Sequence, residues 1–172
     1  MNHQSTDFEL FDLPTQFAQD RAQIDARWKE LQRQAHPDKF AAQGAAAQRV
    51  AMQWSVRINE AYRRLKDPLQ RASYLCELHG APIQAENNTA MPADFLMQQM
   101  AWREALEEAD NVDDLDKIAL ESSTCGRKQL SKIERSIDVE QNFKQAAQEV
   151  RSLMFIERYA SEVNARIELL RK

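Results

Sequence analysis

A proline between two helix-periodic stretches constrains this fold more than any other feature of the 172-residue sequence. Before it, from Asp20 to Ala35, apolar residues recur at helical spacing; after it, from Ala47 to Leu65, a longer apolar stripe follows. Pro37 lacks a backbone donor and disfavours helical geometry in the residue before it. The sequence therefore predicts two helices that pack antiparallel, joined by a tight loop that presents His36, Pro37 and Asp38.

The remaining pattern predicts further helices and no sheet. Only 3 glycines occur in the whole chain, which favours helices. A short apolar segment, 8–13, has the size to cap the helix pair, and Asp67-Pro68 reads as the N-cap and first position of a helix over 68–78. Gly80 and Pro82 end that helix.

A second helical domain is predicted after a polar linker. Three amphipathic helices are expected at about 93–110, 113–136 and 138–171, with Gly126 as a weak point in the second. The expected division is an N-terminal domain over 1–80, a linker over 81–92 and a three-helix domain over 93–172.

Charge and composition exclude several classes of protein. Residues 1–75 hold 11 Lys and Arg against 9 Asp and Glu, a balance of +2, whereas residues 76–172 hold 12 against 18, a balance of −6. Two parts with different partners fit this asymmetry, and general nucleic-acid binding does not. No apolar run approaches the roughly 20 residues that span a bilayer. The first twelve residues contain no Lys or Arg, unlike a secretory signal, so a cytoplasmic protein is expected.

Metal binding and catalysis are weakly supported. Cys76 and Cys125 stand alone without a nearby histidine, so we expect neither a zinc site nor any cofactor. His36 and Asp38 could be read as an acid–base pair or as metal ligands, but they have no third candidate close in sequence. A contact point for a partner is the favoured interpretation of this loop.

The loop and its flanking motifs resemble a J domain, the module by which co-chaperones engage heat-shock-protein-70-class chaperones. The resemblance rests on Arg33-Gln34-Ala35-His36-Pro37-Asp38-Lys39-Phe40, Ile58-Asn59-Glu60-Ala61-Tyr62 and Pro68-Leu69-Gln70-Arg71-Ala72-Ser73-Tyr74-Leu75. With Phe95-Leu96-Met97 opening a second helical domain, nearly the whole chain resembles the HscB family of iron-sulfur co-chaperones. No Gly/Phe-rich segment and no Cys-x-x-Cys repeat follows, unlike generalist J proteins.

The resemblance implies an all-α fold, with a J domain and a C-terminal three-helix bundle in an L-shaped arrangement, and a chaperone partner, HscA, whose ATP hydrolysis this chain stimulates. Asp38 would pair with a partner arginine, while His36 and Pro37 shape the loop. Cationic contacts would come from the helix before the loop and from the residue after it, at Arg27, Lys29, Arg33 and Lys39. A solvated helix face is the alternative for Lys29 and Arg33.

The helix over 93–110 carries two apolar faces. Phe95, Trp102, Leu106 and Ala109 form an ordinary core stripe, and a second patch of Leu96, Met97 and Met100 lies about 140 degrees around the helix. That patch is either a docking site or a surface packed against the first domain. Phe155 falls off the stripe of the last helix, which indicates a tertiary contact or part of a binding patch.

The family resemblance assigns the second patch to binding of the iron-sulfur scaffold protein IscU. The implied residues are Leu96, Met97, Met100 and Phe155, with Arg103, Glu104 and Glu108 around them; Ala101 stands where the family often has a glutamate. The expected protein is a monomeric adaptor in a bacterial cytoplasm that binds HscA and IscU, is no enzyme, and touches neither nucleic acid nor membrane. The alternative is a J-domain protein whose C-terminal bundle is structural or oligomerising, with a different client.

Overall fold

The computed structural model describes residues 4–84 and 92–172, and these residues form helices and no strand, as the sequence predicts. None of the described helices is long and apolar enough to cross a bilayer. The α-helices are α1 (Asp7–Leu10), α2 (Arg21–Ala35), α3 (Ala45–Lys66), α4 (Pro68–Leu78), α5 (Ala93–Glu108), α6 (Val112–Glu134) and α7 (Phe143–Arg171). Two short elements lie between them, a 3-10 helix η1 (Pro37–Gln43) and a π-helix η2 (Arg135–Val139).

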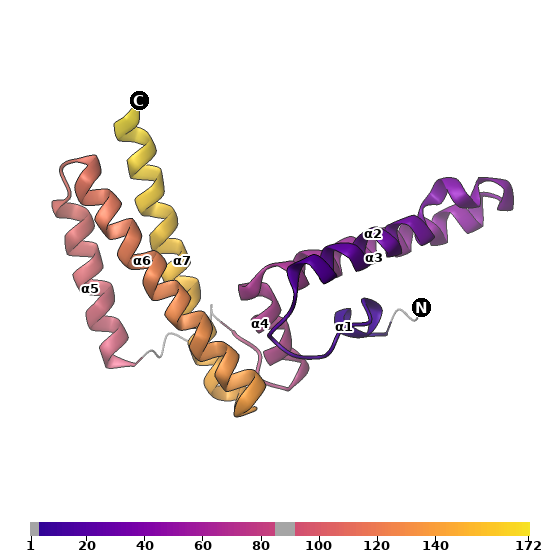
Figure 1. Ribbon diagram of the computed structural model, residues 1–172, viewed down its shortest axis with the longest axis horizontal. Helices are drawn as coiled ribbons and strands as arrows, with labels where there is room; N and C mark the ends of the chain where they lie inside the picture. Colours follow the sequence, from indigo (N-terminus) through magenta and orange to yellow (C-terminus); the bar gives the residue numbers. More distant parts are fainter. Residues whose placement is uncertain (1–3, 85–91) are drawn as a thin grey trace. The chain divides into compact units, whose positions relative to one another are not determined.

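The N-terminal unit, Met1–Leu75, is built on the predicted antiparallel pair of α2 and α3, which lie side by side in Figure 1. Asp20 caps α2 by accepting a hydrogen bond from the backbone amide of Ala22 at 3.0 Å. Gly44 precedes α3 with φ of 97°, a backbone geometry that a residue without a Cβ adopts at little cost. The core of this unit consists of fully buried side chains from α1 to α4, among them Phe8, Phe11, Ile24, Ile58, Leu65 and Leu75.

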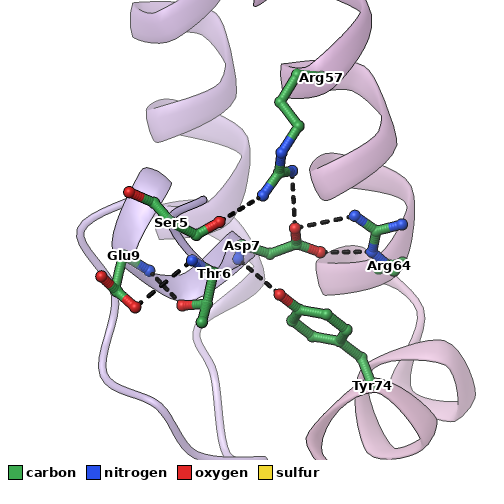
Figure 2. Close-up of polar contacts among 7 residues, drawn as sticks. All are labelled: Ser5, Thr6, Asp7, Glu9, Arg57, Arg64 and Tyr74. Carbon is green, nitrogen blue, oxygen red and sulfur yellow. Dashed lines mark hydrogen bonds and ion pairs between the residues drawn. The ribbon is translucent and has the colours of Figure 1, made fainter. Parts of the chain in front are cut away.

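A buried carboxylate fastens the short α1 to α3 and α4. Asp7 is fully buried and forms ion pairs with Arg57, at 2.8 Å, and with Arg64, at 2.6 Å (Figure 2). Its backbone amide donates to the hydroxyl of Tyr74 at 3.0 Å. Thr6 and Glu9 complete a capping box around the same turn. A helix of one turn has little stability of its own, so these contacts hold it in place.

The C-terminal unit, Cys76–Lys172, is built on α6 and α7, with α5 packed on them. The core stripe predicted for α5 is confirmed. Trp102 and Ala109 are buried, Phe95 and Leu106 pack beside them, and the indole of Trp102 stacks on the ring of Tyr159 with centroids 4.8 Å apart. The hydroxyl of Tyr159 donates to the backbone carbonyl of Trp102 at 2.8 Å.

Three local expectations differ from the structure. The segment after His36 is a 3-10 helix over Pro37–Gln43 rather than an irregular loop, because proline suits the first turn of a helix. The last helix begins at Phe143, not near 138: residues 135–139 form the π-helix, and Gln141 has φ of 52°. The expected weak point at Gly126 does not interrupt α6, which runs through it unbroken.

The end of α4 belongs to the C-terminal unit, because the division between the two units falls between Leu75 and Cys76. Gly80, with φ of 77°, ends the helix as predicted, and the amide of Ala81 bonds back to the carbonyl of Cys76 at 2.8 Å. Ile83 is buried, so the first residues of the expected linker are packed. The rest of that linker, 85–91, lies outside the described residues.

Candidate functional site

The His36-Pro37-Asp38 turn joins two helices and is open to solvent. His36 ends α2 and caps η1: its Nδ1 accepts a hydrogen bond from the backbone amide of Asp38 at 3.2 Å. The same Nδ1 lies 3.6 Å from the carboxylate of Asp38. The amide of Lys39 closes the turn on the carbonyl of His36 at 3.1 Å.

The Asp38 carboxylate is available for a partner. Its side chain is 91% exposed, and the His36 side chain is 55% exposed. Proline at the first helical position and the imidazole cap restrict the backbone that carries this carboxylate. The turn therefore presents an exposed negative charge from a restrained backbone, a suitable arrangement for pairing with a cationic side chain of another protein.

A polar seam between α2 and α3 holds the hairpin that carries the turn. Asn59 accepts hydrogen bonds from the indole of Trp28 at 2.9 Å and from the amide of Gln32 at 2.7 Å. The hydroxyl of Tyr62 donates to Asp25 at 2.7 Å, and its ring stacks on Trp28 with centroids 4.6 Å apart. The bond from Tyr62, and then that from Arg21, lower the pKa of Asp25 below its usual value. These directional contacts set the register of the two helices.

Two residues of the seam, Asn59 and Tyr62, have a structural role that their sequence motif alone did not indicate. Asn59 and Tyr62 belong to the motif Ile58-Asn59-Glu60-Ala61-Tyr62, which served there only as a family resemblance. Their period places them beside the buried Ile58 and Ala61, on the face toward α2. In the sequence, the only sign of this interface was that an asparagine and a tyrosine lie next to the apolar residues of the core stripe.

The cationic candidates on α2 differ in their surroundings. Lys29 and Arg33 are exposed, and Arg33 forms an ion pair with Glu30 one turn away. Arg27 is partly buried and lies 3.5 Å from the carboxylate of Asp12. Surface pairs of this kind contribute about 0–1 kcal/mol, so a partner can displace them at low cost. Lys39 is exposed beside the turn.

The α5 face holds the second group of candidates. Leu96, Met97 and Met100 are exposed, with 45%, 70% and 67% of their surfaces accessible. Around them, Arg103, Glu104 and Glu108 are exposed as well, as is Ala101. None of the described residues of the C-terminal unit covers this patch, so among them it is a solvent-facing apolar strip with a charged border.

Phe155 is placed differently from the other three apolar candidates. It is partly buried against the core that contains Trp102 and Tyr159, and it meets the ring of Phe95 edge-on with centroids 5.7 Å apart. Phe95 precedes Leu96 on α5, so Phe155 supports the base of that helix. Phe155 therefore makes a tertiary contact, which was one of the two interpretations of its position off the apolar stripe.

No group of three or more His, Cys, Asp or Glu among residues 4–84 and 92–172 is arranged to hold a metal ion. Both cysteines are free thiols. Cys76 is buried, and burial raises the pKa of its thiol from 9.0 to about 11. Burial also raises the pKa of the Cys125 thiol. Thiols with a raised pKa are poor nucleophiles and poor ligands at neutral pH.

Comparison with known proteins extends over nearly the whole chain. Residues 91–164 match a family model described as the HSCB C-terminal oligomerisation domain. A Burkholderia multivorans protein named co-chaperone protein HscB homolog is 54% identical over 166 residues, covering 95% of this chain and 94% of that protein. Its namesake from Paraburkholderia xenovorans is 51% identical over the same coverage.

Two solved structures share the fold. The chaperone HscB from Vibrio cholerae has a TM-score of 0.82 and 33% identity, with 96% of this chain and 99% of that one covered. Human co-chaperone protein HscB has a TM-score of 0.85 and 27% identity, with 98% and 83% covered. The relatives are named as chaperones and co-chaperones rather than as enzymes, in agreement with the class predicted from the sequence. This chain belongs to the HscB family of co-chaperones.

Proposed function

We propose that this protein is an adaptor for iron-sulfur cluster assembly in the bacterial cytoplasm. On this proposal the N-terminal unit is a J domain that stimulates ATP hydrolysis by the chaperone HscA. The C-terminal unit binds the scaffold protein IscU. Tethering both sites on one chain raises the effective concentration of scaffold at the chaperone. The observation that carries the proposal is the exposed His36-Pro37-Asp38 turn in a chain of this family.

The charge distribution of the N-terminal unit supports the chaperone contact. Exposed cations at Lys29, Arg33 and Lys39, with Arg27 partly buried beside them, provide attraction toward an acidic surface of the partner. Asp38 has the opposite charge and projects from the turn, so it gives the encounter a single orientation. The hydrolysis itself belongs to the chaperone.

The scaffold contact is supported by the α5 face. Methionines are flexible and polarizable and adapt to a partner surface, and two of them lie here next to Leu96. Phe155 acts in this proposal through Phe95, by fixing the helix that presents the strip. Arg103, Glu104 and Glu108 form the charged rim.

The chaperone half is tested with the variant Asp38→Asn. Its side chain is exposed, so the fold is expected to be unchanged, while stimulation of HscA hydrolysis falls at least tenfold because the carboxylate charge is lost. Steady-state ATPase rates with HscA measure the effect. Asp113→Asn, an exposed aspartate in the C-terminal unit, is the matched control. Normal stimulation by the Asp38 variant would refute this half of the proposal.

The scaffold half is tested on the exposed residues alone. Leu96→Ser combined with Met97→Ser and Met100→Ser removes apolar surface without touching the core, so IscU affinity should fall more than tenfold at unchanged stability. Calorimetric titration with IscU measures this, and Leu120→Ser, which changes an exposed leucine on α6, is the control. Full IscU affinity in the triple variant would exclude this face.

Phe155→Ala needs separate treatment because Phe155 contacts the core. We expect it to weaken both stability and scaffold binding, since it removes the support of Phe95. Binding must therefore be measured at a temperature at which circular dichroism shows the variant to be folded. A loss of stability with normal IscU affinity would leave Phe155 with a packing role only.

A second candidate function follows from the description of the matching family model, which names an oligomerisation domain over residues 91–164. In that case the C-terminal unit joins copies of the chain, in place of the expected monomer. Sedimentation equilibrium between micromolar and millimolar protein separates the two. The triple α5 variant shows whether the same strip serves both purposes.

A further inference from the structure

A pocket in the C-terminal unit is lined by cations and by no acid among the residues that the structure describes. Its lining comes from the segment after α4 and from the first turns of α7, and includes His79, Gln84, Lys144, Gln148 and Arg151. Among its ten described lining residues two are permanently cationic, and none of these ten is Asp or Glu. The unit as a whole has the opposite balance, since residues 76–172 hold 18 acids against 12 bases. We call this the α7 pocket.

The buried cation of the pocket is the guanidinium of Arg151. Arg151 is 8% exposed, and its Nη1 donates to the carbonyl of Ile83 at 2.8 Å. Its buried Nε has no hydrogen-bond partner among the described residues, and no carboxylate among them forms an ion pair with this side chain. A neutral carbonyl leaves the charge unbalanced, and a buried unpaired charge is costly.

The nearest acid along α7 is engaged elsewhere. Glu149 accepts a hydrogen bond from the hydroxyl of Ser136, and burial raises the pKa of its carboxyl group. It lines a different cavity, between α5, α6 and α7. The counter-charge for Arg151 is therefore absent from the neighbouring turn of the helix.

The rest of the α7 pocket also favours a negative ligand. Phe143 and Lys144 are the first two residues of α7, so their amides lack partners within the helix and lie at its positive end. The imidazole of His79 stacks on the ring of Phe143, with centroids 3.8 Å apart and planes 4° from parallel, and forms a flat wall. A helix N-terminus beside a cationic side chain is a recurrent anion site.

We propose that the α7 pocket binds an oxyanion, supplied either by a free phosphate group or by a carboxylate of an acidic protein segment. Lys144 attracts the anion at the mouth, the amides of the first α7 turn donate hydrogen bonds to its oxygens, and Arg151 supplies the neutralising charge. This site contains no residue of the α5 face or of the His36-Pro37-Asp38 turn, so its test does not depend on the proposed function.

The test uses the full chain labelled with ¹⁵N and follows the Nε–H resonance of Arg151. Inorganic phosphate and a capped triglutamate peptide are titrated separately, each against chloride at the same ionic strength. Lys144→Gln changes an exposed side chain and should weaken binding about threefold. Arg151→Lys keeps the charge but loses the planar fork, and should weaken it about tenfold. Lys128→Gln, an exposed lysine on α6 outside the pocket, is the control.

A saturable shift with phosphate alone identifies a free oxyanion as the ligand, and one with the peptide alone identifies a protein carboxylate. Both support the site. The proposal is overturned if neither probe shifts the resonance beyond the chloride reference, or if Lys144→Gln and Lys128→Gln bind equally well. Because Lys144→Gln does not alter a buried group, the test remains valid even if Arg151→Lys fails to fold.

Discussion

The interiors of the two units of this co-chaperone are stabilised by different kinds of interaction. The N-terminal unit places a charged carboxylate in its interior and joins α2 to α3 by a seam of polar hydrogen bonds. The C-terminal unit has an apolar and aromatic cluster around Trp102 and Tyr159. The candidate binding surfaces show the opposite contrast. The N-terminal unit exposes a charged side chain at a turn, and the C-terminal unit exposes apolar side chains on α5.

This difference is related to how each unit packs its helices. A long two-helix hairpin has little interior, so directional bonds such as that from Trp28 to Asn59 define how its helices register. The exposed apolar strip on α5 would compete with the core for burial if the helix could rotate. Trp102 and Phe95 anchor the opposite face of α5 and thereby keep Met97 and Met100 outside.

The largest expected effect is that of Asp7→Asn. The substitution leaves Arg57 and Arg64 without their carboxylate and should cost the N-terminal unit about 3–5 kcal/mol. Hydrogen exchange followed by mass spectrometry, read separately on peptides of each unit, measures it. Asp12→Asn, at an aspartate that is 90% exposed, should change stability by less than about 0.5 kcal/mol. Equal effects of the two variants would show that the buried ion pairs of Asp7 do not stabilise the N-terminal unit more than an exposed aspartate does.

A smaller effect is expected from Tyr159→Phe in the C-terminal unit. The ring and its stacking on Trp102 remain, but the hydrogen bond from the Tyr159 hydroxyl to the carbonyl of Trp102 is lost, which should cost about 1–2 kcal/mol. The same exchange measurement, on peptides of α5 and α7, reports the loss. A cost as large as that of Asp7→Asn would remove the contrast between an ionic and an apolar interior.

The smallest effect at neutral pH concerns Cys76. Burial raises the pKa of its thiol to about 11, so the folded protein keeps it protonated and its alkylation by iodoacetamide at pH 8 should be much slower than in urea. An unfolded thiol ionises near 9, so the contribution of this group to stability is complete below that pH and declines as the pH rises toward 11. Urea titrations of wild type and Cys76→Ala across this range measure the decline. Identical pH profiles would show that the thiol is not shielded.

Much of the fold was predictable because its signals are local. The periodicity before and after Pro37 predicted the α2–α3 pair, and Gly80 predicted the end of α4. The core stripe of α5 was predictable for the same reason, since Trp102 and Ala109 repeat at helical spacing. The exposed strip of Leu96, Met97 and Met100 is the remainder of that pattern, and its role as a scaffold site stays a prediction.

Other features could not be read from local pattern. Asp7 lies 57 residues from Arg64 in sequence, and a lone aspartate in a short segment gives no sign that it will be buried. The last helix begins at Phe143 rather than near 138, since residues 135–139 form a π-helix and Gln141 has φ of 52°, and the apolar spacing signals neither feature. The contact of Phe155 with Phe95 could not be predicted either, because it depends on how α5 packs against α7.

By itself, then, the amino-acid sequence determined the helices, the turn at His36-Pro37-Asp38 and the family, since all three depend on residue types at fixed spacing. The tertiary structure alone decided which charges are paired. It placed Asp7 between two arginines and left Arg151 without an acid among the described residues. Burial and charge pairing join residues far apart in sequence, and spacing along the chain carries no information about such contacts.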